Sequence, residues 1–203
     1  MPLHLGIPPE AVGSLFLGVD PGLAHMGLAV VRIGIKGLHL EHVARVNTYA
    51  RYTLGRRLSQ LRERVLWILE NYTISGAACE KPSMGSQSAP YSLGAAHGLV
   101  HMLLHDAGIP LIGATPKQLT KFASGRTQFS RFSPEQRGGV IKQSTRDGLE
   151  ERFAFDLSQE KHSDPIDAAA LACLACFYFG DVISPNRKQL EVKQAVGIYK
   201  NFN

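Results

Sequence analysis

The sequence has 203 residues, of which 44% are apolar, and its formal net charge is +5 at neutral pH. This length supplies one well-buried core and too little material for two, so we expect a single domain. The longest apolar run, residues 168–180, is too short to span a bilayer, and the N-terminus shows no pattern typical of a secretory leader. These features predict a soluble, cytoplasmic protein without membrane association.

The cysteines and the basic residues add two expectations. Cys79, Cys173 and Cys176 lie in apolar surroundings, which favours reduced core residues over a disulfide framework. Lysine and arginine concentrate in residues 51–64, 117–142 and 187–200. A modest positive charge of this kind is compatible with an anionic partner such as nucleic acid but does not establish one.

Hydrophobic patterning predicts an antiparallel meander at the start of the chain. Residues 15–19, 26–33 and 38–46 read as strands separated by turns. Residues 54–68 repeat apolar side chains at intervals of four and three, with arginines between them, which predicts an amphipathic helix. Residues 74–79 are short and nearly all apolar, as is typical of a strand buried on both faces.

The second half of the sequence predicts one strand and several helices. In chain order we expect a helix over 92–107, a strand over 109–114, a short helix from Thr115 to about Phe122, a loop over 125–139, and helices over 141–153 and 164–179. Together the elements predict an α/β domain at residues 15–180, with a mixed five-stranded sheet covered by helices on both faces. A basic tail at residues 181–203 follows it.

Four carboxylates stand where predicted strands end or a predicted helix begins. Asp20 suits an Asp-Pro-Gly turn, Asp164 and Asp167 suit a helix cap and capping box, and Glu80 could pair with Lys81 on the surface. A shared function explains all four, because the ends of two neighbouring strands and the start of one helix can converge. Hard cations prefer oxygen ligands, so the four acids predict a site for one or two Mg²⁺ or Mn²⁺ ions.

The sequence resembles the RuvC-type crossover junction endodeoxyribonucleases, the Holliday junction resolvases of the RNase H-like superfamily. The resemblance covers about residues 15–180 and rests on LGVDPG at 17–22, on Glu80 about sixty residues later, and on DPIDAAALA at 164–172. The segment GAAHG at 94–98 also resembles a helix opening that lies near the dimer interface in that family.

The resemblance implies a homodimer that binds a four-way DNA junction and nicks two strands symmetrically, leaving 5′-phosphate and 3′-hydroxyl ends. It implies two Mg²⁺ ions per site, with Mn²⁺ as an alternative, and makes Asp20, Glu80, Asp164 and Asp167 both the catalytic residues and the metal ligands. A nearby lysine or His162 would stabilise charge on the phosphate.

The expected DNA contacts are basic residues and possible substitutes for a missing aromatic side chain. They are Lys81, Met84, Tyr91, Lys117, Lys121, Arg126, Arg131 and Lys142. Met84 and Tyr91 are included among these contacts because Ser83 occupies the position at which the family often has an aromatic residue near the junction centre. The family's lysine aligns first with Lys142 and second with Lys121, and contact between DNA and the 125–139 loop stays open.

Other patterns have weaker functional interpretations. His97, His101 and His105 are spaced by four and could supply zinc ligands, although a helix face with unliganded histidines is commoner. Cys173 and Cys176 suit core packing better than a redox pair. Two alternatives to a nuclease remain open, a non-catalytic junction-binding protein and a phosphotransferase of the actin-like superfamily.

Overall fold

The computed structural model describes residues 5–82, 90–125, 133–184 and 186–199. Its strands are β1 (Leu15–Asp20), β2 (His25–Ile33), β3 (Leu38–Asn47), β4 (Ile74–Glu80), β5 (Leu111–Ala114) and β6 (Gly197–Tyr199). They form one sheet in the order β3-β2-β1-β4-β5-β6. β1, β2 and β3 are the predicted antiparallel meander, β4 and β5 continue parallel to β1, and β6 is antiparallel to β5. The predicted mixed five-stranded sheet is confirmed, and the tail adds a short sixth strand.

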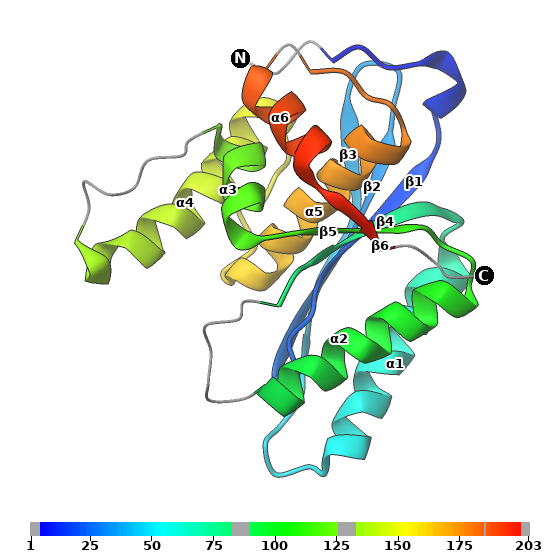
Figure 1. The fold of residues 1–203 in the computed structure, drawn as a ribbon, viewed down its shortest axis with the longest axis vertical. Helices are drawn as coiled ribbons and strands as arrows, with labels where there is room; N and C mark the ends of the chain where they lie inside the picture. The colour runs from blue at the N-terminus through cyan, green and yellow to red at the C-terminus, as the bar shows by residue number, and fades with distance from the viewer. Residues whose placement is uncertain (1–4, 83–89, 126–132, 185, 200–203) are drawn as a thin grey trace.

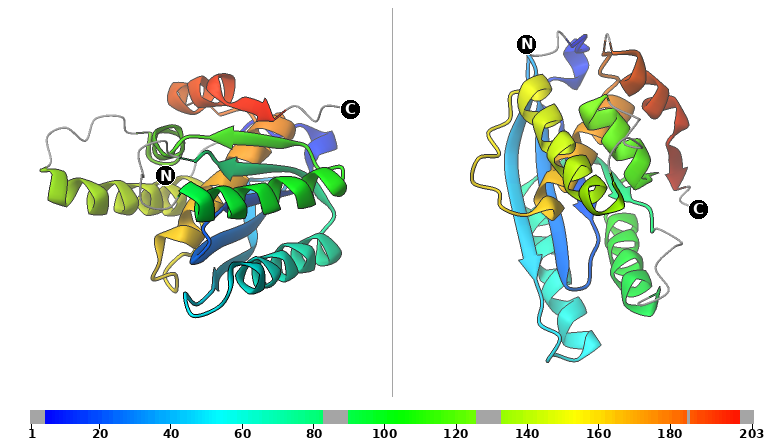
Figure 2. Two further views of the ribbon diagram at one scale, coloured as in Figure 1. Left: turned by 60° about the horizontal axis from the view of Figure 1, so that its bottom comes forward. Right: turned by 90° about the vertical axis from the view of Figure 1, so that its left-hand side faces the viewer.

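Helices cover both faces of this sheet (Figures 1 and 2). They are α1 (Leu54–Asn71), α2 (Pro90–Asp106), α3 (Pro116–Ser124), α4 (Pro134–Phe153), α5 (Ser163–Phe179) and α6 (Arg187–Ala195), and a 3₁₀ turn covers Pro9–Ala11. α1 and α2 lie side by side on one face, whereas α5 crosses the other face with α3 and α4 beside it. Each face carries its own apolar cluster. The predicted α/β class with helices on both faces is confirmed.

Two glycines let α5 lie directly on the sheet. A Cβ at Gly18 would collide with the backbone of Ala168, and a Cβ at Gly27 would collide with the backbone of Asp164. α5 is buried along most of its length because sheet and helices surround it, which explains why its sequence is almost uniformly apolar. The close approach at Gly27 brings the beginning of α5 to the edge where β1 ends.

The prediction of a loop over residues 125–139 is wrong for its second half, because α4 begins at Pro134. The Ser133 hydroxyl accepts a hydrogen bond from the Gln136 backbone N–H, and Pro134 occupies the first turn. This is a standard helix start. Gly138 and Gly139 obscured it, because glycine lowers helix propensity. Residues 126–132 lie outside the described part of the chain.

The predicted tail folds back onto the domain. The Gln118 side-chain amide of α3 donates to the Ala195 carbonyl of α6, and the Lys121 ammonium pairs with Glu191 at 2.7 Å. The predicted boundary at residue 180 between the domain and the tail therefore falls between segments that pack against each other. The division of the chain at this residue stays a prediction. Within the described residues, no helix combines the length and apolar character needed to cross a bilayer.

Candidate active site

The four predicted carboxylates lie at one edge of the sheet. β1 and β4 are parallel neighbours in which Val19 pairs with Cys79, so Asp20 and Glu80 follow side by side. Asp20 is opposite Gly27 of β2, and Gly27 lies against the backbone of Asp164. Asp167 follows on the same helix, one turn further along. Two strand ends and one helix start therefore converge, as the sequence predicts.

The electrostatics show that these acids act on one another. Burial raises the pKa of Asp20 well above its usual range, and the charges of Glu80, Asp167 and Asp164 raise it further. Burial and then Asp167 raise the pKa of Glu80 to about 7. Burial also raises the pKa of Asp167 to about 7, with Lys142 opposing and Asp164 adding to the shift. Such shifts are typical of acids gathered at a functional site.

Asp164 is not the cap of α5. The helix begins at Ser163, its N-cap residue is His162, and no side chain caps it. Asp164 Oδ2 instead accepts a hydrogen bond of 2.8 Å from Nε of Arg45, which reaches across from β3. The capping explanation of Asp164, and the capping box with Asp167 that depends on it, are therefore wrong. The Arg45 contact holds the Asp164 carboxylate in a fixed direction.

The surface pairing of Glu80 with Lys81 is also absent. Both residues are described, and no ion pair of the described residues joins them. The Lys81 ammonium instead lies beside Gly197 of β6. Glu80 is half-buried with a raised pKa and has no positive partner of this kind, so surface pairing does not explain it.

The donor set fits a hard divalent cation. All four residues offer carboxylate oxygens, and three have raised pKa values because burial and like charges disfavour their ionised forms. A cation would relieve both effects. Among the described residues, no three of these oxygens lie within 4.8 Å of one another, so the group is spread more widely than a single collapsed ion site.

A basic cavity of about 480 Å³ has Asp164, one of the four acids, in its wall. Its walls include Arg45, Lys142, Lys161 and His162 beside Asp164. The Arg146 guanidinium of α4 donates to the carbonyls of Leu157 and Glu160, which anchors the loop that carries Lys161 and His162. A cavity lined by basic side chains and Asp164 offers a binding place for a phosphate group next to the carboxylates.

Two of the predicted DNA-contacting residues, Lys142 and Lys121, lie in different surroundings. Lys142 is exposed, lines the basic cavity, and its charge lowers the pKa of both Asp20 and Asp167. Lys121 lies on α3 in its ion pair with Glu191. Of the two lysines aligned with the family residue, only Lys142 is therefore near the carboxylates.

The other predicted contacts lie around the same edge or outside the described residues. Lys117 is exposed in the first turn of α3, directly after β5, and Tyr91 is 78% exposed in the first turn of α2. Met84, Arg126 and Arg131 lie outside the described part of the chain.

Sequence reasoning missed Arg45, His25 and Lys161, which line the basic cavity. Arg45 lies within a strand, and no motif marks it. Its alternation with apolar neighbours indicates only which face of β3 it occupies, not what that face meets.

Comparisons with known proteins identify the family of this chain. The model of the family "Crossover junction endodeoxyribonuclease RuvC" matches residues 16–132. The chain belongs to the RuvC family. The RuvC of Cytophaga hutchinsonii is 26% identical over 199 residues, covering 96% of this chain and 86% of that protein. The RuvC of Thermus thermophilus is 30% identical over 112 residues, covering 53% and 68%.

A solved structure shows the same fold. Thermus thermophilus RuvC in complex with a Holliday junction substrate superposes with a TM-score of 0.65 at 23% identity, covering 78% of this chain and 90% of that chain. The predicted RuvC resemblance and RNase H-like architecture are confirmed. The predicted activity, a crossover junction endodeoxyribonuclease, is that of the family to which the chain belongs, and the nucleases of this family are metal-dependent.

We expect Glu80→Gln to raise the melting temperature of the metal-free protein at pH 8 by roughly 2–8 °C. The folded pKa of Glu80 is about 7 against a usual value of 4.5, so the folded state binds more protons than the unfolded state between these values. Stability therefore falls as pH rises through this window, and the full penalty is present above it. The gain from Glu80→Gln should be smaller at pH 5, and the variant should gain less stability from Mg²⁺.

Melting curves at both pH values, in EDTA and in Mg²⁺, measure this effect. Glu63→Gln is the matched control, because Glu63 is exposed on α1, away from the acids. A Glu80→Gln protein that melts lower than wild type in EDTA and responds normally to Mg²⁺ would remove Glu80 from the site.

Proposed function

We propose that this protein is a Mg²⁺-dependent endonuclease that resolves four-way DNA junctions by symmetric nicking, leaving 5′-phosphate and 3′-hydroxyl ends. The observation that carries the proposal is the convergence of Asp20, Glu80, Asp164 and Asp167 beside a basic cavity. Membership of the RuvC family supports the junction as substrate. The cytoplasmic location expected from the sequence stays a prediction.

In this proposal the four carboxylates are the catalytic residues and hold two Mg²⁺ ions, for which Mn²⁺ is an alternative. When bound, such ions supply an activated water and stabilise the leaving 3′ oxygen of an in-line displacement. Asp20 is buried and feels the charges of the other three acids, so it would help to hold the metal at the centre of the group. Lys142 and His162 would hold the phosphate from the cavity side. Arg45 orients Asp164 through its hydrogen bond.

We also propose that the protein acts as a homodimer through the exposed side of α2. Gly94 and Gly98 are exposed there, with open space where a Cβ would stand, and Met102 is 50% exposed one turn further. Small residues spaced by four admit close approach of a second helix. A two-fold axis would present two identical sites to two strands of like polarity, which accounts for symmetric nicking. The wider DNA surface would include Lys81, Tyr91 and Lys117, and beyond the described residues Met84, Arg126 and Arg131.

Cleavage of a synthetic four-way junction tests the function. We expect paired nicks in the junction with Mg²⁺, no cleavage in EDTA, and at least about tenfold slower cleavage of linear duplex and single strands, since tenfold corresponds to about 1.4 kcal/mol in the barrier. Ligation of the products checks the predicted end chemistry. Tight junction binding without cleavage in any divalent metal would instead identify a non-catalytic junction-binding protein.

A further inference from the structure

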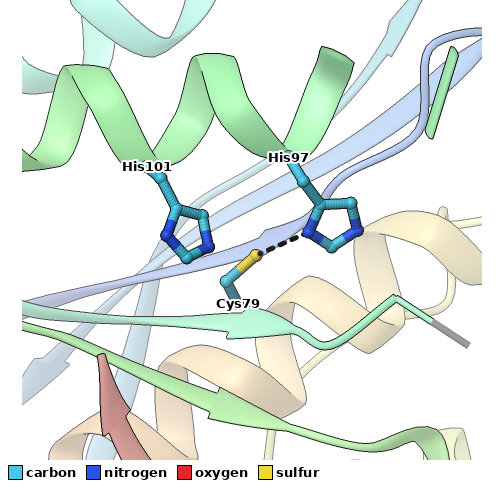
Figure 3. Close-up of side chains that lie close together, drawn as sticks. All are labelled: Cys79, His97 and His101. Carbon is cyan, nitrogen blue, oxygen red and sulfur yellow. Dashed lines mark hydrogen bonds between the residues drawn. The ribbon is translucent and has the colours of Figure 1, made fainter. Parts of the chain in front are cut away.

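A second group of metal-ligating side chains lies on the face of β4 that is turned away from α5. Cys79 of β4 faces His97 and His101, which both extend from α2 towards it (Figure 3). Each residue offers one ligand atom, and these three atoms all lie within 4.8 Å of one another. Among the described residues this is the only such group of histidine, cysteine and acidic side chains.

The spacing is close to that of a bound ion. Cys79 Sγ and His97 Nδ1 are 3.9 Å apart. Zinc lies about 2.3 Å from a thiolate and about 2.0–2.1 Å from an imidazole nitrogen, so tetrahedral ligands of these two kinds are about 3.6 Å apart. Small side-chain rotations would close the difference. The i, i+4 spacing of the histidines already places both rings over the same strand.

We propose that Cys79, His97 and His101 form a binding site for a thiophilic metal ion, for which Zn²⁺ is the best match, separate from the carboxylate site. One thiolate and two imidazoles suit Zn²⁺, whereas Mg²⁺ requires oxygen ligands. The two sites of the chain therefore select different metals. A solvent molecule would complete four-coordination, as in other sites with three protein ligands.

Burial and charge are consistent with this assignment. Cys79 and His97 are buried, whereas His101 is half-buried and therefore partly accessible to solvent. Burial lowers the pKa of His97 to about 4, with His101 adding to the shift, and burial lowers the pKa of His101 as well. Both imidazoles are therefore neutral near pH 7, which is the form that binds metal.

The thiol is the group that must change on binding. Without metal, the Cys79 thiol lies 3.4 Å from the Glu80 carbonyl oxygen, to which it donates, and 3.9 Å from Nδ1 of His97. Metal binding would release the thiol proton to solvent and pair the thiolate with the cation. The hydrogen-bonded pair of Cys79 and His97, together with the contact of the thiol with the Glu80 carbonyl, is the competing explanation.

Titration of the full-length protein with Zn²⁺ tests the proposal, with millimolar Mg²⁺ present so that the carboxylates are occupied. We expect one Zn²⁺ per chain and, with Co²⁺ in its place, a thiolate-to-metal charge-transfer band. Mutations of outer-shell partners cost metal sites about 10–100-fold in affinity, so loss of a ligand in Cys79→Ala should weaken Zn²⁺ binding by more than about 100-fold. The same variant should lose the charge-transfer band.

His101→Gln provides a second test, because His101 is half-buried whereas Cys79 is fully buried, so we expect its substitution to disturb the core less. His105→Gln is its matched control, since His105 lies on the same helix but is exposed and outside the group. We expect His105→Gln to bind Zn²⁺ as wild type does and His101→Gln to bind it weakly. No Zn²⁺ binding by the wild type, or equal binding by His101→Gln and His105→Gln, would overturn the proposal and leave only the hydrogen-bonded pair.

Discussion

Asp20→Asn should reduce junction cleavage by at least about 10³-fold, equivalent to about 4 kcal/mol in the barrier, while junction binding stays within a few-fold of wild type. Asp20 feels the charges of the other three acids, and an amide at this position removes a charged metal ligand at nearly constant shape. The substitution also removes a buried carboxyl whose ionised form is disfavoured, so we expect the variant to remain folded.

Single-turnover cleavage of a labelled junction and a gel-shift titration in Ca²⁺ measure the two quantities separately. Asp106→Asn is the control, because Asp106 is exposed at the end of α2. Near-normal cleavage by the Asp20→Asn protein would disprove the four-carboxylate site. A parallel loss of binding and cleavage would make Asp20 a determinant of DNA binding instead.

Lys142→Met should slow cleavage by about 10²-fold, the loss that is typical when one donor to a developing negative charge is removed. Lys142 lines the basic cavity, and its charge lowers the pKa of both Asp20 and Asp167. Removing it should raise these pKa values further, so the pH at which cleavage becomes active should move upward. A mere folding defect would not shift the pH profile in this way.

Lys121→Met is the matched comparison, because its ammonium is paired with Glu191 of α6. We expect it to change the cleavage rate by less than about threefold, since an ion pair at the surface contributes little. Lys142→Arg should recover part of the rate by keeping the charge. If Lys121→Met slowed cleavage and Lys142→Met did not, the alignment of the family lysine with Lys121 would be the correct one.

Much of the fold follows from local patterns in the sequence. Residues 15–19 are apolar because β1 is central and covered on both faces, and the apolar repeat of residues 54–68 marks the one face of α1 that meets the sheet. The same apolar runs predict the positions of Asp20 and Glu80, because each acid directly follows the last apolar residue of a strand. The sequence predicts the start of this helix at residue 141, whereas α4 begins at Pro134, because the glycines near its start conceal the Ser133 cap.

Outside the carboxylate group, only the tertiary structure decided which distant side chains meet. The hydrogen bond between Arg45 and Asp164 joins residues 119 positions apart, and the Lys121–Glu191 pair joins residues 70 apart. The three ligand atoms of Cys79, His97 and His101 come together because α2 packs against β4, although the histidine spacing alone favoured an ordinary helix face. Sequence periodicity shows which face of a helix or strand is apolar, because the residues that form this face are close together in the sequence. The partners on the other side of that face depend on how elements remote in the chain pack, and no local pattern contains this information.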